Sequence, residues 1–145
     1  MNNSVSVTSL PTRQQESQPR GLPPWVYRHP ELMKLEIERI LRPSWQIVCH
    51  ISQIKKPGDF VTFELGTDSV VVLREPGGAI RAFHNVCRHR GTRLLEGSGT
   101  CPGRIVCPYH GWTYRYDGSL LATPARDTFP TVSYTHLTLP TKRIV

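Results

Sequence analysis

The spacing of hydrophobic positions changes at Trp45, and this change separates a helical segment from a β-rich one. Before it, apolar residues recur at helical intervals from Met33 to Leu41. Pro30 suits the first position of a helix, and Pro43 cannot continue one. The pattern therefore predicts one short helix between these two prolines.

After this point the chain consists of short apolar runs separated by turn residues at intervals of about ten residues. We expect strands over the runs WQIVCHISQI (45–54), FVTFEL (60–65), VVVLRE (70–75), AIRAFHNV (79–86), YRY (114–116) and SLLA (119–122). Pro-Gly-Asp, Pro-Gly-Gly and Asp-Gly turns lie between several of them. This cadence predicts a mainly β fold, a small antiparallel β-sandwich preceded by one short helix.

The N-terminal segment, residues 1–24, differs in composition from the rest of the chain. It is rich in Ser, Thr, Gln and Pro and poor in large apolar side chains, so we expect it to be mobile. It lacks the basic start and apolar run of an export signal, and no stretch is long enough for a membrane span. These features predict a cytoplasmic protein with no membrane association.

The C-terminal segment, residues 132–145 (VSYTHLTLPTKRIV), breaks the pattern of the preceding chain. Its first ten residues resemble the in-frame translation of a transposase adapter used in shotgun sequencing libraries. The alternative is a genuine strand of Thr, Leu and Val. The resemblance predicts that residues 132–145 are an artefact that adds nothing to the fold, and that the natural chain continues beyond Thr131, so that this sequence is a fragment.

The net charge of +7 and the four cysteines restrict the possible functions only slightly. The basic residues are scattered and form no run or helical stripe, so we interpret them as a solvated surface and expect no nucleic-acid partner. In a reducing compartment, cysteines serve as metal ligands or buried apolar residues more often than in disulfides.

Two loops carry the candidate chemistry, CRHRG at 87–91 and CPYHGW at 107–112. Each contains one cysteine and one histidine. A Rieske [2Fe–2S] centre needs two Cys on one iron and two His on the other, which two facing loops of this kind can supply. Structural zinc sites, the competing interpretation, typically pair like residues within a loop. The predicted cluster ligands are Cys87, His89, Cys107 and His110.

The segments FHNVCRHRGTRLL (83–95) and CPYHGWTYRYDGSLLATPA (107–125) resemble the N-terminal Rieske domain of the alpha subunits of Rieske non-heme iron oxygenases. These are the ring-hydroxylating dioxygenases and their monooxygenase relatives. The similarity extends over residues 25–131. It implies an N-terminal extension with the helix at 25–43 and a Rieske [2Fe–2S] domain at 44–131.

The resemblance excludes the respiratory and photosynthetic Rieske proteins, which have two further cysteines that bridge the cluster loops. Thr92 and Tyr109 occupy those positions here, so no bridge can form. Trp112 stands where those proteins place a serine hydroxyl on a cluster sulfur. Fewer hydrogen bonds to sulfur imply a reduction potential low in the Rieske range of roughly −150 to +300 mV. Two roles stay open for Trp112 and Tyr114, shielding the cluster from water or packing alone. We expect Cys101 to be an ordinary loop thiol.

The resemblance also implies a function for the intact protein. A ferredoxin or flavin reductase would supply electrons to the cluster, which would pass them to a mononuclear Fe(II) held by two His and one carboxylate. There O₂ would be activated and an organic substrate hydroxylated, within a homo-oligomer, usually a trimer. In the family that iron belongs to a C-terminal domain beyond residue 145. No catalytic residue or mononuclear-iron ligand can therefore be named, and the fragment alone is not expected to be catalytically competent.

Two alternatives from other functional classes remain open at this stage. A stand-alone Rieske-type ferredoxin would carry electrons without acting on a substrate, but it would normally begin close to the first strand. The predicted helix at 30–42 therefore favours the oxygenase. A zinc-stabilised interaction module is the other alternative. The sequence does not identify the substrate, and it leaves mono- and dioxygenation equally open.

Overall fold

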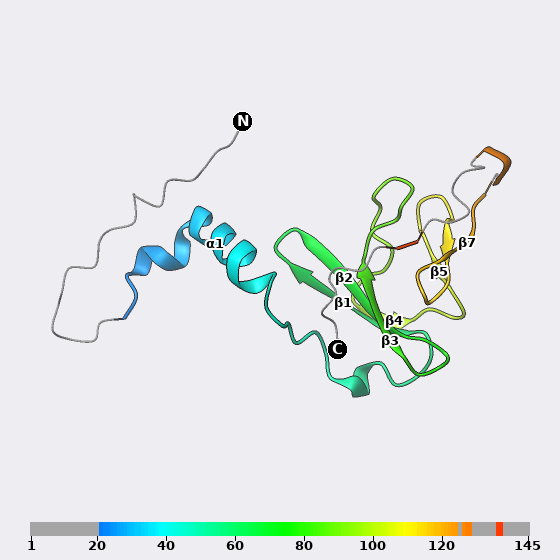
Figure 1. Ribbon diagram of the computed structural model, residues 1–145, viewed down its shortest axis with the longest axis horizontal. Coiled ribbons are helices and arrows are strands. Elements are labelled where there is room, and N and C mark those ends of the chain that lie inside the picture. The colour runs from blue at the N-terminus through cyan, green and yellow to red at the C-terminus, as the bar shows by residue number, and fades with distance from the viewer. Residues whose placement is uncertain (1–20, 125, 129–135, 138–145) are drawn as a thin grey trace.

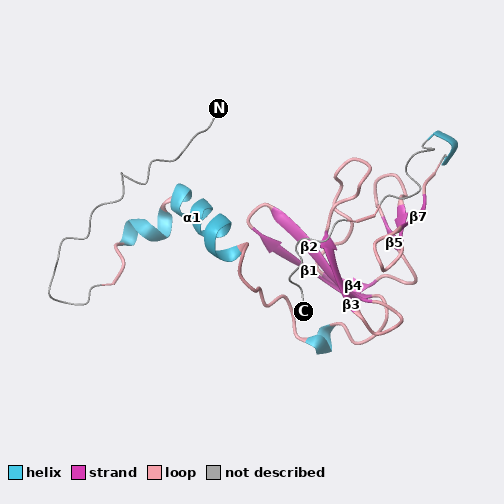
Figure 2. Ribbon diagram, in the orientation of Figure 1, coloured by secondary structure: helices cyan, strands magenta, loops and turns pink. Residues whose placement is uncertain are grey.

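Two antiparallel β-sheets form the main body of the chain, and a helical arm extends from one side of it (Figures 1 and 2). The computed structural model describes residues 21–124, 126–128 and 136–137. Most of the predicted mobile segment, residues 1–20, lies outside the described residues. No helix among the described residues is long and apolar enough to cross a membrane.

The larger sheet is built mainly from neighbouring segments of the chain. Strands β1 (Asp59–Leu65), β2 (Asp68–Arg74) and β3 (Ile80–His84) form a meander, and β4 (Ser98–Thr100) returns to pair with β1. The order across the sheet is therefore β3-β2-β1-β4. Strands β1, β2 and β3 confirm the strands predicted at 60–65, 70–75 and 79–86. In these segments the apolar runs and the turn residues between them indicate the same strand boundaries.

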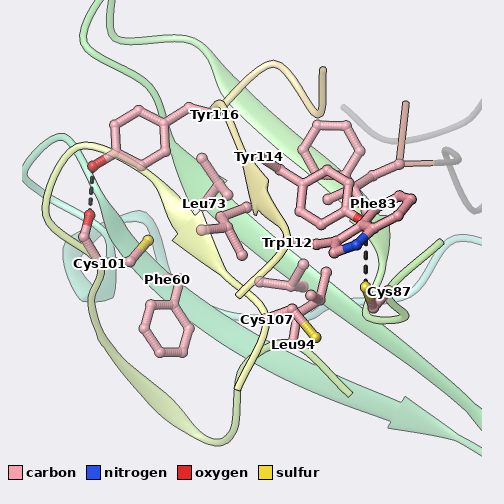
Figure 3. Packing of buried hydrophobic residues seen from close by; sticks show 13 residues of the cluster. Phe60, Leu73, Phe83, Cys87, Leu94, Cys101, Cys107, Trp112, Tyr114 and Tyr116 are labelled. Carbon is pink, nitrogen blue, oxygen red and sulfur yellow. Dashed lines mark hydrogen bonds between the residues drawn. The ribbon is translucent and has the colours of Figure 1, made fainter. Parts of the chain in front are cut away.

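The smaller sheet contains β5 (Ile105–Val106), β6 (Thr113–Tyr114) and β7 (Leu120–Ala122), in that order. Buried side chains from both sheets share one core, drawn in Figure 3, in which Val71, Leu73, Ile105 and Tyr114 are almost completely shielded from solvent. A second, smaller cluster around Ile54 lies on Val72 and Ala82. The mainly β fold class is thus confirmed.

The predicted helix begins at Pro30, as its sequence indicates. Helix α1 (Pro30–Glu36) continues into a wider turn, η3 (Ile37–Leu41), and a short 3-10 helix, η2 (Pro24–Arg28), precedes it. None of these residues is buried, although the side chain of Ile37 lies against Gly66 in the β1–β2 turn. Arg42 forms an ion pair of 2.9 Å with Asp68. The arm therefore contacts the tip of one hairpin through Ile37 and Arg42 and leaves Met33, Ile40 and Leu41 exposed.

The prediction of a strand at 45–54 is wrong. Residues 45–50 have no regular structure, and Ile51–Gln53 form a 3-10 helix, η4. His50 caps this helix in two ways. Its ring Nδ1 accepts the backbone N–H of Ser52, and its backbone N–H donates to the side-chain oxygen of Gln53. Ile47 is 95% exposed, so the apolar run does not bury one face. At residues 51–53, local capping has overridden the β-propensity of the sequence.

The C-terminal segment contributes two described residues, and both contradict the expectation that it adds nothing to the fold. His136 pairs with Ser119 in an isolated β-bridge. Leu137 is only 4% exposed, belongs to the main core and donates its N–H to the Gly118 carbonyl at 2.8 Å. The other residues of 132–145 lie outside the described residues. The adapter origin of the segment stays a prediction.

Deleting residues 132–145 is therefore expected to destabilise the chain by about 2–4 kcal/mol, the sum of a buried leucine side chain and one backbone hydrogen bond. Chemical denaturation followed by circular dichroism measures this change. The matched control deletes residues 138–145 only and retains Leu137. A loss below about 0.5 kcal/mol for the longer deletion would show that the contacts of Leu137 do not stabilise the fold.

Candidate metal centre

The first predicted ligand loop is a tight turn closed by its own backbone. The N–H of Cys87 donates to the Thr92 carbonyl at 2.7 Å, and the N–H of Gly91 donates back to the Cys87 carbonyl at 3.0 Å. Gly91 has φ +71°, a conformation that only glycine adopts without strain. The loop therefore holds a cysteine at its base and turns within five residues.

The second loop repeats this backbone geometry. Cys107 donates to the Trp112 carbonyl at 2.8 Å, Gly111 donates back to Cys107 at 3.0 Å, and Gly111 has φ +67°. The histidines differ, however, because His89 lies two residues after its cysteine and His110 three. The two loops are thus near copies of one turn, and each offers one thiol and one imidazole.

The structure places the thiols inside and the imidazoles near the surface. Cys87 and Cys107 are 2% and 3% exposed and belong to the main core, whereas His110 is exposed and His89 is partly so. The two imidazole rings lie 4.9 Å apart, centre to centre. The four predicted ligands therefore form an inner sulfur pair and an outer nitrogen pair.

Burial affects the protonation of Cys87. It raises the pKa of the Cys87 thiol above its ordinary value, although the hydrogen bond with Tyr114 acts in the opposite direction. A buried thiol of this kind releases its proton when a cation binds beside it, because the cation compensates the desolvated charge. The site thus suits metal binding rather than a free thiolate.

Tyr114 connects the main hydrophobic core to the first ligand loop. Its hydroxyl oxygen lies 3.2 Å from Cys87 Sγ (Figure 3). The same oxygen accepts the N–H of Arg88 at 3.1 Å. Burial raises the pKa of Tyr114, so the phenol keeps its proton. Since the oxygen accepts from Arg88, its hydrogen can be donated to the sulfur. The sequence left shielding and packing open for Tyr114 and did not indicate this direct contact, which joins residues 27 positions apart.

Aromatic rings lie against both imidazoles. Trp112 is 3% exposed and stacks on His89 with ring centres 4.9 Å apart and planes 1° from parallel. Tyr109 stacks on His110 at 3.8 Å and is itself exposed. Burial lowers the pKa of His89, and the positive charges of His110 and Arg90 lower it further. A neutral imidazole is the form that binds a metal.

The arrangement of these side chains fits a two-iron cluster, because the thiols and the imidazoles occupy different levels of the site. Two separated pairs, one of sulfur and one of nitrogen, are what a Rieske [2Fe–2S] cluster needs. Cys49, Cys87, Cys101 and Cys107 all have free thiols.

Cys101, the remaining buried cysteine of the core, is not part of this arrangement. Its thiol donates to the Gly58 carbonyl at 3.3 Å, and its own carbonyl accepts from the Tyr116 hydroxyl. Figure 3 shows Cys101 and Tyr116 on the opposite side of the core from Cys87 and Cys107. The expectation of an ordinary loop thiol agrees with these contacts.

Comparison with known proteins decides between the metal-site interpretations. The family model described as the Rieske [2Fe–2S] domain matches residues 44–135. This chain belongs to the Rieske family. The match excludes the zinc module as an account of this domain and supports the iron–sulfur cluster.

Relatives of this Rieske domain occur in oxygenase alpha subunits. The chain is 42% identical, over 104 residues, to the N,N-dimethyl phenylurea N-demethylase subunit alpha of a Sphingobium species, covering 72% of this chain and 23% of the relative. It is 41% identical, over 101 residues, to the benzene 1,2-dioxygenase subunit alpha of Pseudomonas putida, covering 70% and 22%. The chain thus spans less than a quarter of the length of these curated relatives.

A solved structure agrees with this assignment. The crystal structure of the quaternary ammonium Rieske monooxygenase CntA with a bound inhibitor superposes with a TM-score of 0.72 at 34% sequence identity, covering 79% of this chain and 32% of that one. The Rieske domain described above is therefore homologous to the oxygenase alpha subunits in both sequence and fold.

Proposed function

We propose that this chain is the electron-relay part of an oxygenase alpha subunit. Cys87 and Cys107 bind one iron of a Rieske [2Fe–2S] cluster, and His89 and His110 bind the other. The observation that carries this proposal is the pair of matching turns, each with a thiol in the core and an imidazole at the surface. Bound there, the cluster supplies one-electron redox chemistry.

The chain's own residues prepare this site for electron transfer. Tyr114 donates a hydrogen bond to the Cys87 sulfur, and Trp112 covers one face of the His89 ring. Both aromatic side chains are buried, so they also keep water from the sulfur side. The exposed His110 is then the side of the site that another protein or domain can approach most closely.

The surface around the imidazoles favours an acidic electron donor. Arg88 and Arg90 flank His89 in the sequence and are both exposed. A ferredoxin or flavin reductase with a complementary acidic surface would be steered towards this edge. The names of the relatives support an oxygenase over a stand-alone ferredoxin as the parent protein. In that parent, a mononuclear Fe(II) outside this chain would use O₂ to hydroxylate an organic substrate, within a homo-oligomer.

Electron paramagnetic resonance of the iron- and sulfide-reconstituted chain tests the proposal. After reduction with dithionite, we expect an average g value clearly below that of an all-cysteine [2Fe–2S] ferredoxin measured in parallel, because imidazole ligation changes the reduced iron. With a reductase and NADH, the cluster should bleach without forming hydroxylated product. Stoichiometric zinc with no such signal would contradict the cluster, and product formation would contradict the relay-only role.

Replacing Tyr114 by Phe is expected to lower the reduction potential. The Tyr114 hydroxyl stabilises the reduced cluster, which is the more negative form, and phenylalanine lacks this hydroxyl. A hydrogen bond of about 1 kcal/mol corresponds to a change in reduction potential of roughly 40 mV for a one-electron couple. Protein-film voltammetry measures the shift. Tyr116→Phe is the control, since that hydroxyl bonds Cys101 and Gly103 instead. An unchanged potential in Tyr114→Phe would show that its contact with Cys87 does not affect the cluster.

A further inference from the structure

The two ligand loops are closed at their bases in different ways. The second loop joins β5 to β6, and these strands pair directly, Ile105 with Tyr114 and Val106 with Thr113. The first loop lies between β3 and β4, which are at opposite edges of the sheet in the order β3-β2-β1-β4. No strand pairing can therefore close the base of the first loop, although its backbone turn matches that of the second.

The side chain of Asn85 closes this base instead. Its Oδ1 accepts the N–H groups of Leu94 at 3.2 Å and Leu95 at 3.0 Å, and its Nδ2 donates to the Leu95 carbonyl at 2.7 Å. The side-chain amide thus bonds the far side of the loop as a peptide group of a neighbouring strand would. Asn85 is 2% exposed, so water does not compete for these bonds.

The same residue ties the loop to the sheet. Its backbone N–H donates to the Ser69 carbonyl at 2.8 Å, and its Nδ2 also donates to the Ser69 hydroxyl at 3.1 Å. Both hydrogens of the amide and two acceptor positions of its oxygen are therefore used. At the exit of the loop, Leu94, whose N–H donates to Asn85, has its side chain buried in the main core. Asn85 accordingly links strand β2, the entry of the loop and its exit.

We propose that Asn85 is a positioning residue for the cluster. It fixes the ends of the turn that carries Cys87 and His89, and so holds these two ligands at a constant distance from those of the second loop. This inference rests on the proposed function, because it assumes that the two loops bind one cluster. Asn85 does not contact the metal site as a ligand. It acts through the backbone of the loop.

The rate of cluster loss tests this role in the reconstituted 145-residue chain. With an iron chelator present, Asn85→Ala is expected to lose its visible absorbance at least about tenfold faster than the parent, the usual effect of removing a group that orients a metal ligand. Its electron paramagnetic resonance lines should broaden, because the ligands then adopt a range of positions. Thermal unfolding of each variant without the cluster measures its global stability.

Tyr116→Phe is the matched control for lost stability. It also removes buried hydrogen bonds, to the Cys101 carbonyl and from the Gly103 N–H, on the opposite side of the core (Figure 3). It is expected to lower the unfolding temperature while changing the rate of cluster loss by no more than about twofold. Asn85→Ser keeps a polar side chain but is too short to make the amide bonds to Leu95. It should also lose the cluster faster than the parent, and it replaces Asn85→Ala if that variant does not fold.

The outcomes separate the two proposals. If the parent chain takes up no [2Fe–2S] cluster, the proposed function fails and the role of Asn85 fails with it. If the parent holds the cluster but the Asn85 variants lose it no faster than Tyr116→Phe, Asn85 affects only global stability and its positioning role alone is overturned.

Discussion

Replacing Cys107 by alanine is expected to abolish the iron–sulfur cluster, whereas replacing Cys101 by alanine is expected to retain it. Both side chains are buried in the same core, at 3% and 7% exposure, and both changes remove one sulfur atom. Only Cys107 lies in a turn that matches the other predicted ligand turn. Its loss leaves one iron with a single thiolate, which does not hold a Rieske cluster.

Iron and acid-labile sulfide content, with the visible spectrum after reconstitution, distinguishes the two variants. His110→Ala is expected to behave like Cys107→Ala, because the other iron then loses one imidazole. Thermal unfolding of both cysteine variants without metal shows whether they fold equally well. Full cluster content in Cys107→Ala, or its loss in Cys101→Ala, would contradict the proposed set of ligands.

Gly58→Ala is expected to destabilise the fold by at least about 3 kcal/mol, through backbone strain and a collision together. Gly58 has φ +87°, and a Cβ at this position would lie 2.5 Å from the Cys101 carbonyl oxygen and 2.6 Å from the Tyr116 hydroxyl oxygen. The carbonyl belongs to the backbone and already accepts from Tyr116, so it cannot move aside freely. Chemical denaturation measures the loss.

Gly78→Ala separates the two causes. Gly78 has φ +86°, nearly the same as Gly58, but no atom lies within 4 Å of a Cβ built there. Strain alone should cost about 1–2 kcal/mol at this position. Equal losses in the two variants would show that the contact of Gly58 with Cys101 and Tyr116 adds nothing to the effect.

The features that sequence analysis predicted correctly depend on residues close together in the chain. The strands of the β1–β3 meander follow from apolar runs and the turn residues between them. The matching backbone turns of the two loops follow from Cys, His and Gly residues a few positions apart, and the helix start follows from Pro30, whereas the role of the loops as cluster ligands stays a prediction. In each case the physical cause lies within a few residues, so the sequence is sufficient to predict it.

The features that it missed depend on distant partners. Strand β4 is a polar Ser-Gly-Thr segment, and it forms because β1 offers it an edge and because Gly99 lets the Phe60 ring approach. The bonds of Asn85 depend on Ser69 and on the far side of the loop. The burial of Leu137 depends on the turn at Gly118. In each of these cases, the local sequence around a residue does not indicate which distant residue it will contact.

The strand order also has a consequence for how the chain folds. The pairs within the meander join residues close in sequence, such as Leu65 with Asp68, whereas β4 pairs Asp59 with Thr100. Closing the longer loop costs more chain entropy, and long-range contacts form later than local hairpins. Cys87 lies within that long loop, and Cys107 follows it. We expect the meander to form first, and the two thiols to meet only after β4 has joined β1, so that cluster insertion is a late event in folding.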